Sequence, residues 1–146
     1  MADTPNFAAL YRDRVLDHGR APRHAGTLDD ASHRASAHNA LCGDRVELGL
    51  LLGQDGRIAA LRHQSEGCLL CVASASLMAC DVAGRDLHEV TARLQALRAG
   101  ITHGDSEGLD ELGALAGVSA HPARHRCVLL PWECLQQALA GEGEAT

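Results

Sequence analysis

The sequence contains no lysine, and all 13 of its basic residues are arginines. These arginines form no run, and the formal net charge of the 146-residue chain is −6. Proteins that bind nucleic acids typically carry a basic face or stripe. The composition therefore argues against a nucleic-acid partner.

Aromatic residues are nearly as scarce, since Phe7, Tyr11 and Trp132 are the only three. The hydrophobic content of 46% is typical of a globular protein, but it consists mostly of alanine and leucine. Small and aliphatic side chains favour a core built on helices over a β-sandwich. The length is sufficient to bury one core, so we expect a single domain over residues 1–146, with a flexible tail from about residue 142.

Long hydrophobic runs are also missing. No apolar stretch approaches the roughly 20 residues that a membrane-spanning helix needs, so no membrane association is expected. Residues 1–6 lack the basic start and the apolar centre of a signal peptide, so we expect a cytoplasmic protein. Thiols are kept reduced in the cytosol, and the six cysteines therefore indicate metal or redox chemistry before structural disulfides.

Apolar residues at helical spacing predict five helices. The first is expected to begin at Thr4-Pro5, a capping residue followed by proline, and to end at Gly19. Residues 100–108 are polar and contain several glycines, so we expect a mobile loop there, and residues 117–122 are expected to form a connection. The other four helices are expected over residues 69–82, 86–98, 109–115 and 122–140.

Two apolar runs, residues 45–52 and 57–64, flank an Asp55-Gly56 turn and predict an antiparallel hairpin. A further short strand is expected near residues 34–38. A hairpin followed by helices favours an α+β fold, in which a small antiparallel sheet of about three strands packs against several helices in a two-layer sandwich.

The ends of this hairpin carry residues that can bind a metal ion. Cys42 and Asp44 lie at its start and Cys68 lies just beyond its end, so the hairpin brings them to one edge of the sheet. With Cys127 from the last helix, three thiols and one carboxylate would complete a tetrahedral site for a thiophilic ion, usually zinc. Gly67 and Cys68 place a thiol at a helix N-terminus, where its pKa is lowered. Each cysteine could instead be a buried packing residue.

Three further cysteines follow different patterns. Cys71 lies one helical turn after Cys68 and is a possible extra thiol of the site, with buried packing as the alternative. Cys80 and Cys134 are predicted to belong to the core. A disulfide between Cys68 and Cys71 within one turn would be strained.

Two histidines and two arginines lie near the site in sequence. His38 and His125 could take a coordination position, but an exposed side chain is favoured for both. Arg124 and Arg126 flank Cys127 and could screen the thiolates or bind a carboxylate of a partner, with a solvated helix face as the alternative. The other histidines considered are expected in helix-end, loop or exposed positions and to bind nothing: His18, His24, His33, His63, His88 and His103.

Several short motifs occur in order along nearly the whole chain. They are Leu10-Tyr11, Val15-Leu16-Asp17-His18, Pro22-Arg23, Asn39-Ala40-Leu41-Cys42-Gly43-Asp44, Glu66-Gly67-Cys68, Ala73-Ser74-Ala75-Ser76-Leu77-Met78, Gly84 and Arg124-His125-Arg126-Cys127-Val128-Leu129-Leu130-Pro131-Trp132. With these motifs the sequence resembles the U-type iron–sulfur cluster assembly proteins, a family that includes IscU, SufU and the N-terminal domain of NifU. The resemblance implies a SufE/NifU-like fold.

Within that family the sequence is most similar to the SufU branch. Cys127 follows Cys68 by 59 positions, which resembles SufU with its extra segment, here about residues 100–120. Arg126 stands where the IscU type has a histidine. The sequence departs from the family at Ala40, where proline is usual, and at Cys71, where a thiol is unusual.

The resemblance implies a zinc-dependent sulfurtransferase-type carrier, and whether such a carrier counts as an enzyme stays open. Zinc would be held by Cys42, Asp44, Cys68 and Cys127, and Arg124 would contact Asp44 or the partner. The implied partner is a pyridoxal-phosphate-dependent cysteine desulfurase of the SufS type, and a histidine of that desulfurase would replace Cys42 at the zinc.

Cys42 would then attack the persulfide of the desulfurase and pass the sulfur on to downstream iron–sulfur scaffold proteins. One alternative is a scaffold that assembles and donates a [2Fe–2S] cluster on the same ligands. Another is a structural or regulatory zinc module without a transfer role.

Overall fold

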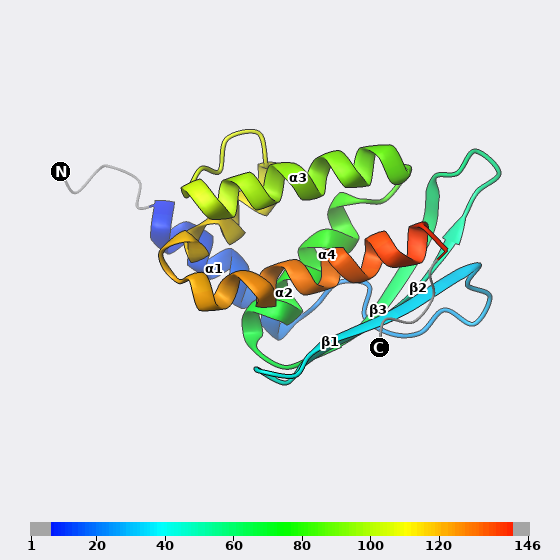
Figure 1. Cartoon of the computed structure of the whole chain (residues 1–146), viewed down its shortest axis with the longest axis horizontal. Coiled ribbons are helices and arrows are strands. Elements are labelled where there is room, and N and C mark those ends of the chain that lie inside the picture. The colour runs from blue at the N-terminus through cyan, green and yellow to red at the C-terminus, as the bar shows by residue number, and fades with distance from the viewer. Residues whose placement is uncertain (1–6, 142–146) are drawn as a thin grey trace.

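The computed structural model describes residues 7–141, with side chains from Arg12 onward. Figure 1 shows a small sheet covered on one face by helices. Helices α2 and α4 contact the sheet, and α1, α3 and η1 pack against them from outside. The predicted α+β sandwich is confirmed. The elements are α1 (Phe7–Arg20), β1 (His33–Asn39), β2 (Asp44–Leu52), β3 (Ile58–Glu66), α2 (Leu69–Asp81), α3 (Leu87–His103), the 3-10 helices η1 (Asp110–Ala120) and η2 (Pro122–Arg124), and α4 (His125–Leu139).

The sheet is antiparallel with the order β1-β2-β3, and it contains the predicted hairpin. The N–H of Gly53 donates to the carbonyl of Arg57 across the turn, and Gly56 takes the positive φ that such a turn needs. Side chains alternate between a buried face toward the helices and an outer face. The pairing of Asn39 with Asp44 places the β1–β2 turn, which carries Cys42, at one end of the sheet.

Helix α1 continues through Gly19 and ends at Arg20, so glycine does not end it. A Cβ at Gly19 would lie 2.2 Å from Cδ1 of Leu69, in the first turn of α2. Gly19 therefore permits a close approach of the two helices. The predicted start at Thr4-Pro5 lies outside the described residues.

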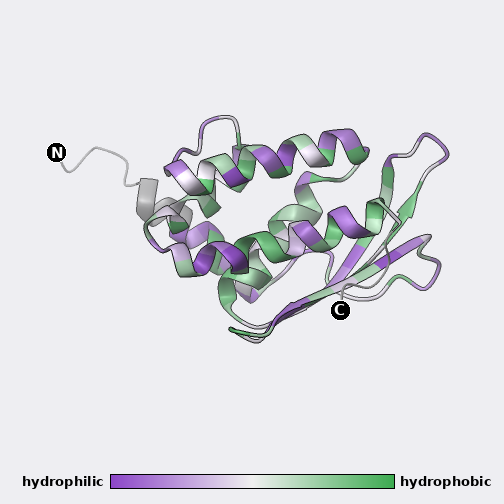
Figure 2. Ribbon diagram, viewed as in Figure 1, coloured by the Kyte–Doolittle hydropathy of each residue, from purple (hydrophilic) through white to green (hydrophobic). Residues whose placement is uncertain are grey.

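Helix α3 is longer than predicted. It starts at a capping box formed by Asp86 and Glu89 and ends at Gly104 in the left-handed conformation. Gly100, expected in a mobile loop, lies inside α3. Its missing side chain lets the segment after α3 pack closely against the helix, since a Cβ there would lie 2.6 Å from the carbonyl oxygen of Asp105. The hydropathy colouring of α3 alternates as expected for an amphipathic helix (Figure 2).

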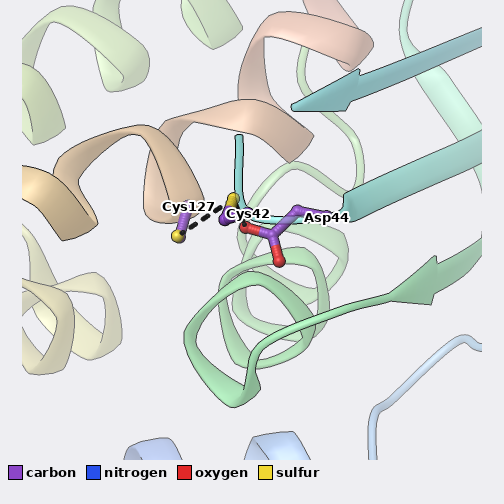
Figure 3. Close-up of side chains that lie close together, drawn as sticks. All are labelled: Cys42, Asp44 and Cys127. Carbon is purple, nitrogen blue, oxygen red and sulfur yellow. Dashed lines mark hydrogen bonds between the residues drawn. The ribbon is translucent and has the colours of Figure 1, made fainter. Parts of the chain in front are cut away.

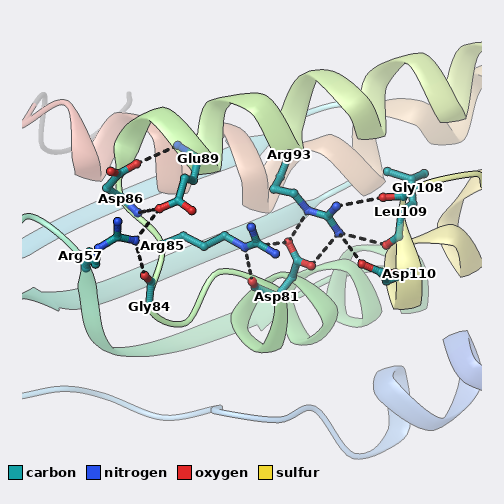
Figure 4. A network of polar contacts seen from close by, with 10 residues as sticks. All are labelled: Arg57, Asp81, Gly84, Arg85, Asp86, Glu89, Arg93, Gly108, Leu109 and Asp110. Atoms are coloured by element: carbon teal, nitrogen blue, oxygen red, sulfur yellow. Dashed lines mark hydrogen bonds and ion pairs between the residues drawn. The ribbon is translucent and has the colours of Figure 1, made fainter.

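The helix predicted over residues 109–115 is present, but it is a 3-10 helix and continues to residue 120, so the prediction of a connection over 117–122 is wrong for most of its length. Residues 110–120 form the 3-10 helix η1. Its large buried side chains, Leu112, Leu115 and Val118, recur at intervals of three, and the small residues Gly113, Ala114 and Ala116 are buried as well. Three residues per turn is the repeat of a 3-10 helix. Arg93 fixes the start of this segment, because it donates hydrogen bonds to the carbonyls of Gly108 and Leu109 (Figure 4).

No helix among residues 7–141 is long and apolar enough to cross a membrane.

Candidate metal centre

Four elements meet where the sequence predicts a metal site. Cys42 lies in the β1–β2 turn, Asp44 begins β2, Cys68 is the N-cap of α2, and Cys127 lies in the first turn of α4. One ligand atom each from Cys42, Asp44 and Cys127 lies within 4.8 Å of the others (Figure 3). The structure thus brings together residues that are far apart in the sequence.

The carboxylate of Asp44 is the buried centre of this group. Its Oδ2 accepts a hydrogen bond of 3.0 Å from Cys42 Sγ, and its Oδ1 accepts one of 2.8 Å from the N–H of Cys68. Burial alone would raise the pKa of Asp44, but hydrogen bonds from Cys127, Cys42 and Cys68 outweigh burial and hold the pKa below its ordinary value. Asp44 is therefore ionised at neutral pH.

The thiols differ in exposure. Cys42 is exposed, Cys68 is half-buried and Cys127 is buried, yet Sγ of Cys42 lies 3.8 Å from Sγ of Cys127. Burial, followed by contact with Asp44 and Cys68, raises the pKa of Cys127. Cys68 falls outside the group of three, although its Sγ lies 3.8 Å from Asp44 Oδ2. Cys68 is thus placed to be a fourth ligand beside the group.

This donor set fits a soft cation. Thiolates and a carboxylate repel one another when all are ionised, and none of the ion pairs found among the described residues involves Asp44. A bound cation would supply the missing positive charge. Sulfur ligands with one carboxylate favour zinc or iron–sulfur clusters over magnesium or calcium.

The backbone explains how these groups converge. The carbonyl of Asn39 accepts hydrogen bonds from the N–H groups of Cys42 and Gly43, and Gly43 has a φ of 76°. A Cβ at Gly67 would lie 2.2 Å from Asp44 Oδ1. Two glycines are therefore needed, one to turn the chain between the ligands and one to let α2 begin beside Asp44.

Asn39 has a role that our sequence reasoning did not assign. Besides its carbonyl, its side-chain Oδ1 accepts a hydrogen bond from the N–H of Leu41, two residues on, and the residue is buried. This arrangement is an Asx turn, which asparagine favours. An asparagine directly before a turn was the available signal.

The flanking arginines and histidines lie outside the group of ligand atoms formed by Cys42, Asp44 and Cys127. Arg124 and Arg126 are exposed, and among residues 7–141 neither forms an ion pair, with Asp44 or with any other acidic group. His125 donates from Nε2 to the carbonyl of Val118, which ties α4 to η1. His38 is exposed, as expected.

The remaining cysteines separate into two groups. Cys71 and Cys134 are fully buried, and burial raises the pKa of both, to about 12 for Cys134. Cys71 therefore matches the packing alternative. The prediction that Cys80 belongs to the core is wrong, because Cys80 is exposed. It follows Cys71 by nine residues, or about two and a half helical turns, and so lies on the opposite face of α2.

Two histidines expected at exposed or helix-end positions are buried instead. His18 Nδ1 lies 2.7 Å from the hydroxyl oxygen of Ser76, and His63 donates from Nε2 to the carbonyl of Arg23 at 2.9 Å. His18 thus joins α1 to α2, and His63 joins β3 to the segment that follows α1. Their role is structural, and they lie outside the metal group.

The chain is similar in sequence and in fold to several known proteins. The model of the family described as NifU-like N terminal domain matches residues 10–140. The zinc-dependent sulfurtransferase SufU of Bacillus subtilis is 35% identical over 146 residues, covering 97% of each chain. The iron–sulfur cluster assembly scaffold protein IscU of Thermotoga maritima is 29% identical over 136 residues, covering 91% of this chain and 94% of the relative. The crystal structure of a NifU-like protein (N-terminal) from Brucella abortus has a TM-score of 0.82 at 25% identity, covering 92% of this chain and 95% of that one.

Proposed function

The chain belongs to the family of NifU-like N-terminal domains, and on that premise we propose that it is a zinc-dependent sulfur acceptor in iron–sulfur cluster biogenesis. Its partner would be a pyridoxal-phosphate-dependent cysteine desulfurase, and its product would be a persulfide on Cys42 that is delivered to a downstream scaffold protein. The similarity to SufU over nearly the full length supports this choice within the family.

One observation carries the proposal, namely the unequal exposure of the site's thiols. Cys42 is exposed at the tip of a turn, whereas Asp44 and Cys127 are buried behind it. A purely structural metal site would have no need to expose one ligand to a partner. An exposed thiol in contact with a buried carboxylate and a second thiol suits a group that must react with another protein.

The zinc would be held by Asp44, Cys68, Cys127 and Cys42, whose thiols and carboxylate are typical zinc ligands. When bound, zinc would keep the coordinating sulfurs as thiolates at neutral pH. The chain itself contributes the arrangement: the turn that Asn39 stabilises holds Cys42 at an exposed position beside Asp44, and the N–H of Cys68 fixes the Asp44 carboxylate.

Sulfur transfer to Cys42 balances without an added oxidant. The Cys42 thiolate would attack the outer sulfur of a persulfide on the desulfurase, so that an S–S bond forms at Cys42 Sγ while the S–S bond of the donor breaks. The donor cysteine leaves as a thiolate, which takes the electron pair of the broken bond. The persulfide on Cys42 is then open to the next acceptor because this position is exposed.

The second candidate function is assembly of a [2Fe–2S] cluster on the same side chains. The near full-length similarity to a scaffold protein named IscU favours it, and the donor set suits iron–sulfur clusters as well as zinc. Metal analysis of protein purified without oxygen separates the two. Stoichiometric zinc supports the sulfur acceptor, and stoichiometric iron with sulfide supports the scaffold.

The decisive test compares wild type with Cys42→Ala, using Cys80→Ala as a control because Cys80 is also exposed but lies outside the site. Each zinc-loaded protein is incubated with the desulfurase and cysteine. Wild type and Cys80→Ala should gain the mass of one sulfur atom and stimulate desulfurase turnover, whereas Cys42→Ala should do neither. Equal stimulation by Cys42→Ala would refute the transfer role.

A further inference from the structure

The most exposed large hydrophobic side chain among the described residues lies beside the candidate sulfur acceptor. Leu41 is 95% exposed and directly precedes Cys42. Leu69, which directly follows Cys68, is 38% exposed. Two of the three exposed large hydrophobic residues therefore adjoin site cysteines, and the third, Leu87, begins α3.

The turn that presents Leu41 is held in place by hydrogen bonds. The N–H of Leu41 donates to the side chain of Asn39 at 3.1 Å, and the N–H of Gly43 donates to the Asn39 carbonyl at 2.8 Å. Asn39 is itself buried and paired with Asp44 across β1 and β2. Leu41 is therefore displayed in water by an anchored backbone, although it makes no contribution to the core.

Charged residues of both signs flank the site cysteines: the exposed Glu66 precedes Cys68 by two residues, and two exposed arginines precede Cys127. Arg126 directly precedes Cys127, whose sulfur lies 3.8 Å from that of Cys42, and Arg124 precedes it by three residues. Both arginines are exposed and without an ion pair among residues 7–141, while seven other arginines in that part of the chain have acidic partners. On a chain of net charge −6, these two charges are free to meet an acidic surface.

We propose that Leu41 is the apolar anchor of the docking surface for the sulfur-donating protein, inserting into a recess whose rim is acidic and faces Arg124 and Arg126. The inference rests on the proposed function. Sulfur exchange requires the donor sulfur to reach contact distance of Cys42 Sγ, and neighbouring Cα atoms are about 3.8 Å apart. A protein that delivers sulfur to Cys42 therefore reaches the turn that carries the exposed Leu41.

A second copy of this chain fits the surface less well. A symmetric dimer through this face would bring the Arg124 and Arg126 side chains of both copies to one interface, because a two-fold interface pairs a patch with itself. Like charges facing each other across an interface oppose association. A distinct protein with acidic groups avoids that repulsion.

The test compares Leu41→Ser with wild type, and Leu87→Ser serves as the matched control because Leu87 is 42% exposed and lies away from the site on α3. The partner is the cysteine desulfurase encoded by the same genome. Leu41→Ser should raise both the Kd for the desulfurase and the concentration that half-saturates its stimulation by about tenfold, the effect of losing one buried leucine. Turnover at saturation and the melting temperature should stay as in wild type.

Salt dependence tests the charged rim. Binding of wild type should weaken as ionic strength rises, and the double variant Arg124→Gln, Arg126→Gln should bind more weakly at low salt and respond less to added salt. A Kd for Leu41→Ser equal to that of wild type would overturn the inference. So would a wild-type dimer in light scattering that Leu41→Ser dissociates, since the occupant would then be a second copy.

The outcomes also separate this inference from the proposed function. If wild type acquires sulfur on Cys42 and Leu41→Ser binds as tightly as wild type, the docking inference fails and the sulfur-acceptor function stands. If Leu41→Ser loses affinity but wild type never gains sulfur on Cys42, the docking surface stands and the function fails.

Discussion

The N–H of Cys68 donates a 2.8 Å hydrogen bond to Oδ1 of Asp44, which ties the start of α2 to the start of β2. This N–H belongs to the first turn of a helix, where backbone donors lack an intrahelical partner. The other oxygen of the same carboxylate accepts a hydrogen bond from the thiol of Cys42. The helix start and the reactive turn are thus joined through one buried side chain.

We predict that Gly67→Ala disrupts this junction. Gly67 has a φ of 124°, and a Cβ there would lie 2.2 Å from Asp44 Oδ1 and 2.7 Å from Asp44 Cα. Backbone strain alone costs about 1–3 kcal/mol, and the clash adds to it. The free energy of unfolding in urea should fall, and the zinc bound per chain should fall with it, because Asp44 and Cys68 can no longer lie so close.

Gly56→Ala is the control for that experiment. Gly56 has a φ of 78° in the hairpin turn, but a Cβ there would meet nothing within 4 Å. The Gly56→Ala variant should therefore lose free energy of unfolding through backbone strain alone, without a clash, and its zinc content should match wild type. Equal zinc losses in the two variants would contradict the importance of the Cys68–Asp44 junction.

The parts of the fold that depend on local sequence were predictable. The hairpin follows from the Asp55-Gly56 turn between two apolar runs, and both ends were placed to within two residues. The region after Arg98 was not predictable in the same way. Gly100 was interpreted as a loop residue, but its close contact with Asp105 is a tertiary feature that a helical pattern does not reveal.

The candidate site also combines residues that local sequence could place with residues that only tertiary contacts place. Cys42 and Asp44 could be placed together from their spacing and from the hairpin. Cys127, 85 residues after Cys42, was proposed as a ligand because it offers a third thiol, since no local pattern predicts that the last helix starts beside the hairpin; the family resemblance supported this choice. Counting helical turns from Cys71 would have placed Cys80 on the opposite face of α2. His63 gave no sign of burial, because its environment is built by the segment around Arg23.

A second prediction concerns Arg93, which joins α2, α3 and the segment before η1 (Figure 4). It is largely buried and forms two hydrogen bonds with Asp81, at 2.8 and 3.0 Å. Arg93→Gln would leave the buried Asp81 without its main partner and two carbonyls without a donor. We expect a loss of about 2–3 kcal/mol in the free energy of unfolding, measured in urea, since breaking a buried pair is costly.

Arg57→Gln is the matched control for Arg93→Gln. Arg57 also pairs with an acidic side chain of α3, Glu89, but both partners are well exposed. Exposed pairs contribute at most about 1 kcal/mol, so this variant should be close to wild type. If both variants lost the same stability, burial of the Arg93–Asp81 pair would not be the cause.

The last prediction is a pH dependence of stability that involves His63. Burial lowers the pKa of His63 below its ordinary value of 6.5, and the hydrogen bond to the carbonyl of Arg23 offsets this only in part. The unfolded chain therefore binds a proton at a higher pH than the folded chain does. Since stability rises with pH wherever the unfolded state holds more protons, the contribution is complete above about pH 6.5 and is lost as the pH falls below it.

The measurement is urea unfolding between about pH 8 and pH 5, over which this linkage acts. His63→Gln should lower stability at pH 8, because a buried hydrogen-bond donor to the Arg23 carbonyl is changed, and should flatten the decline toward pH 5. Some decline should remain, since burial also lowers the pKa of His18. His88→Gln, at an exposed position, should keep the slope of wild type. An unchanged slope in His63→Gln would show that its protonation does not couple to unfolding.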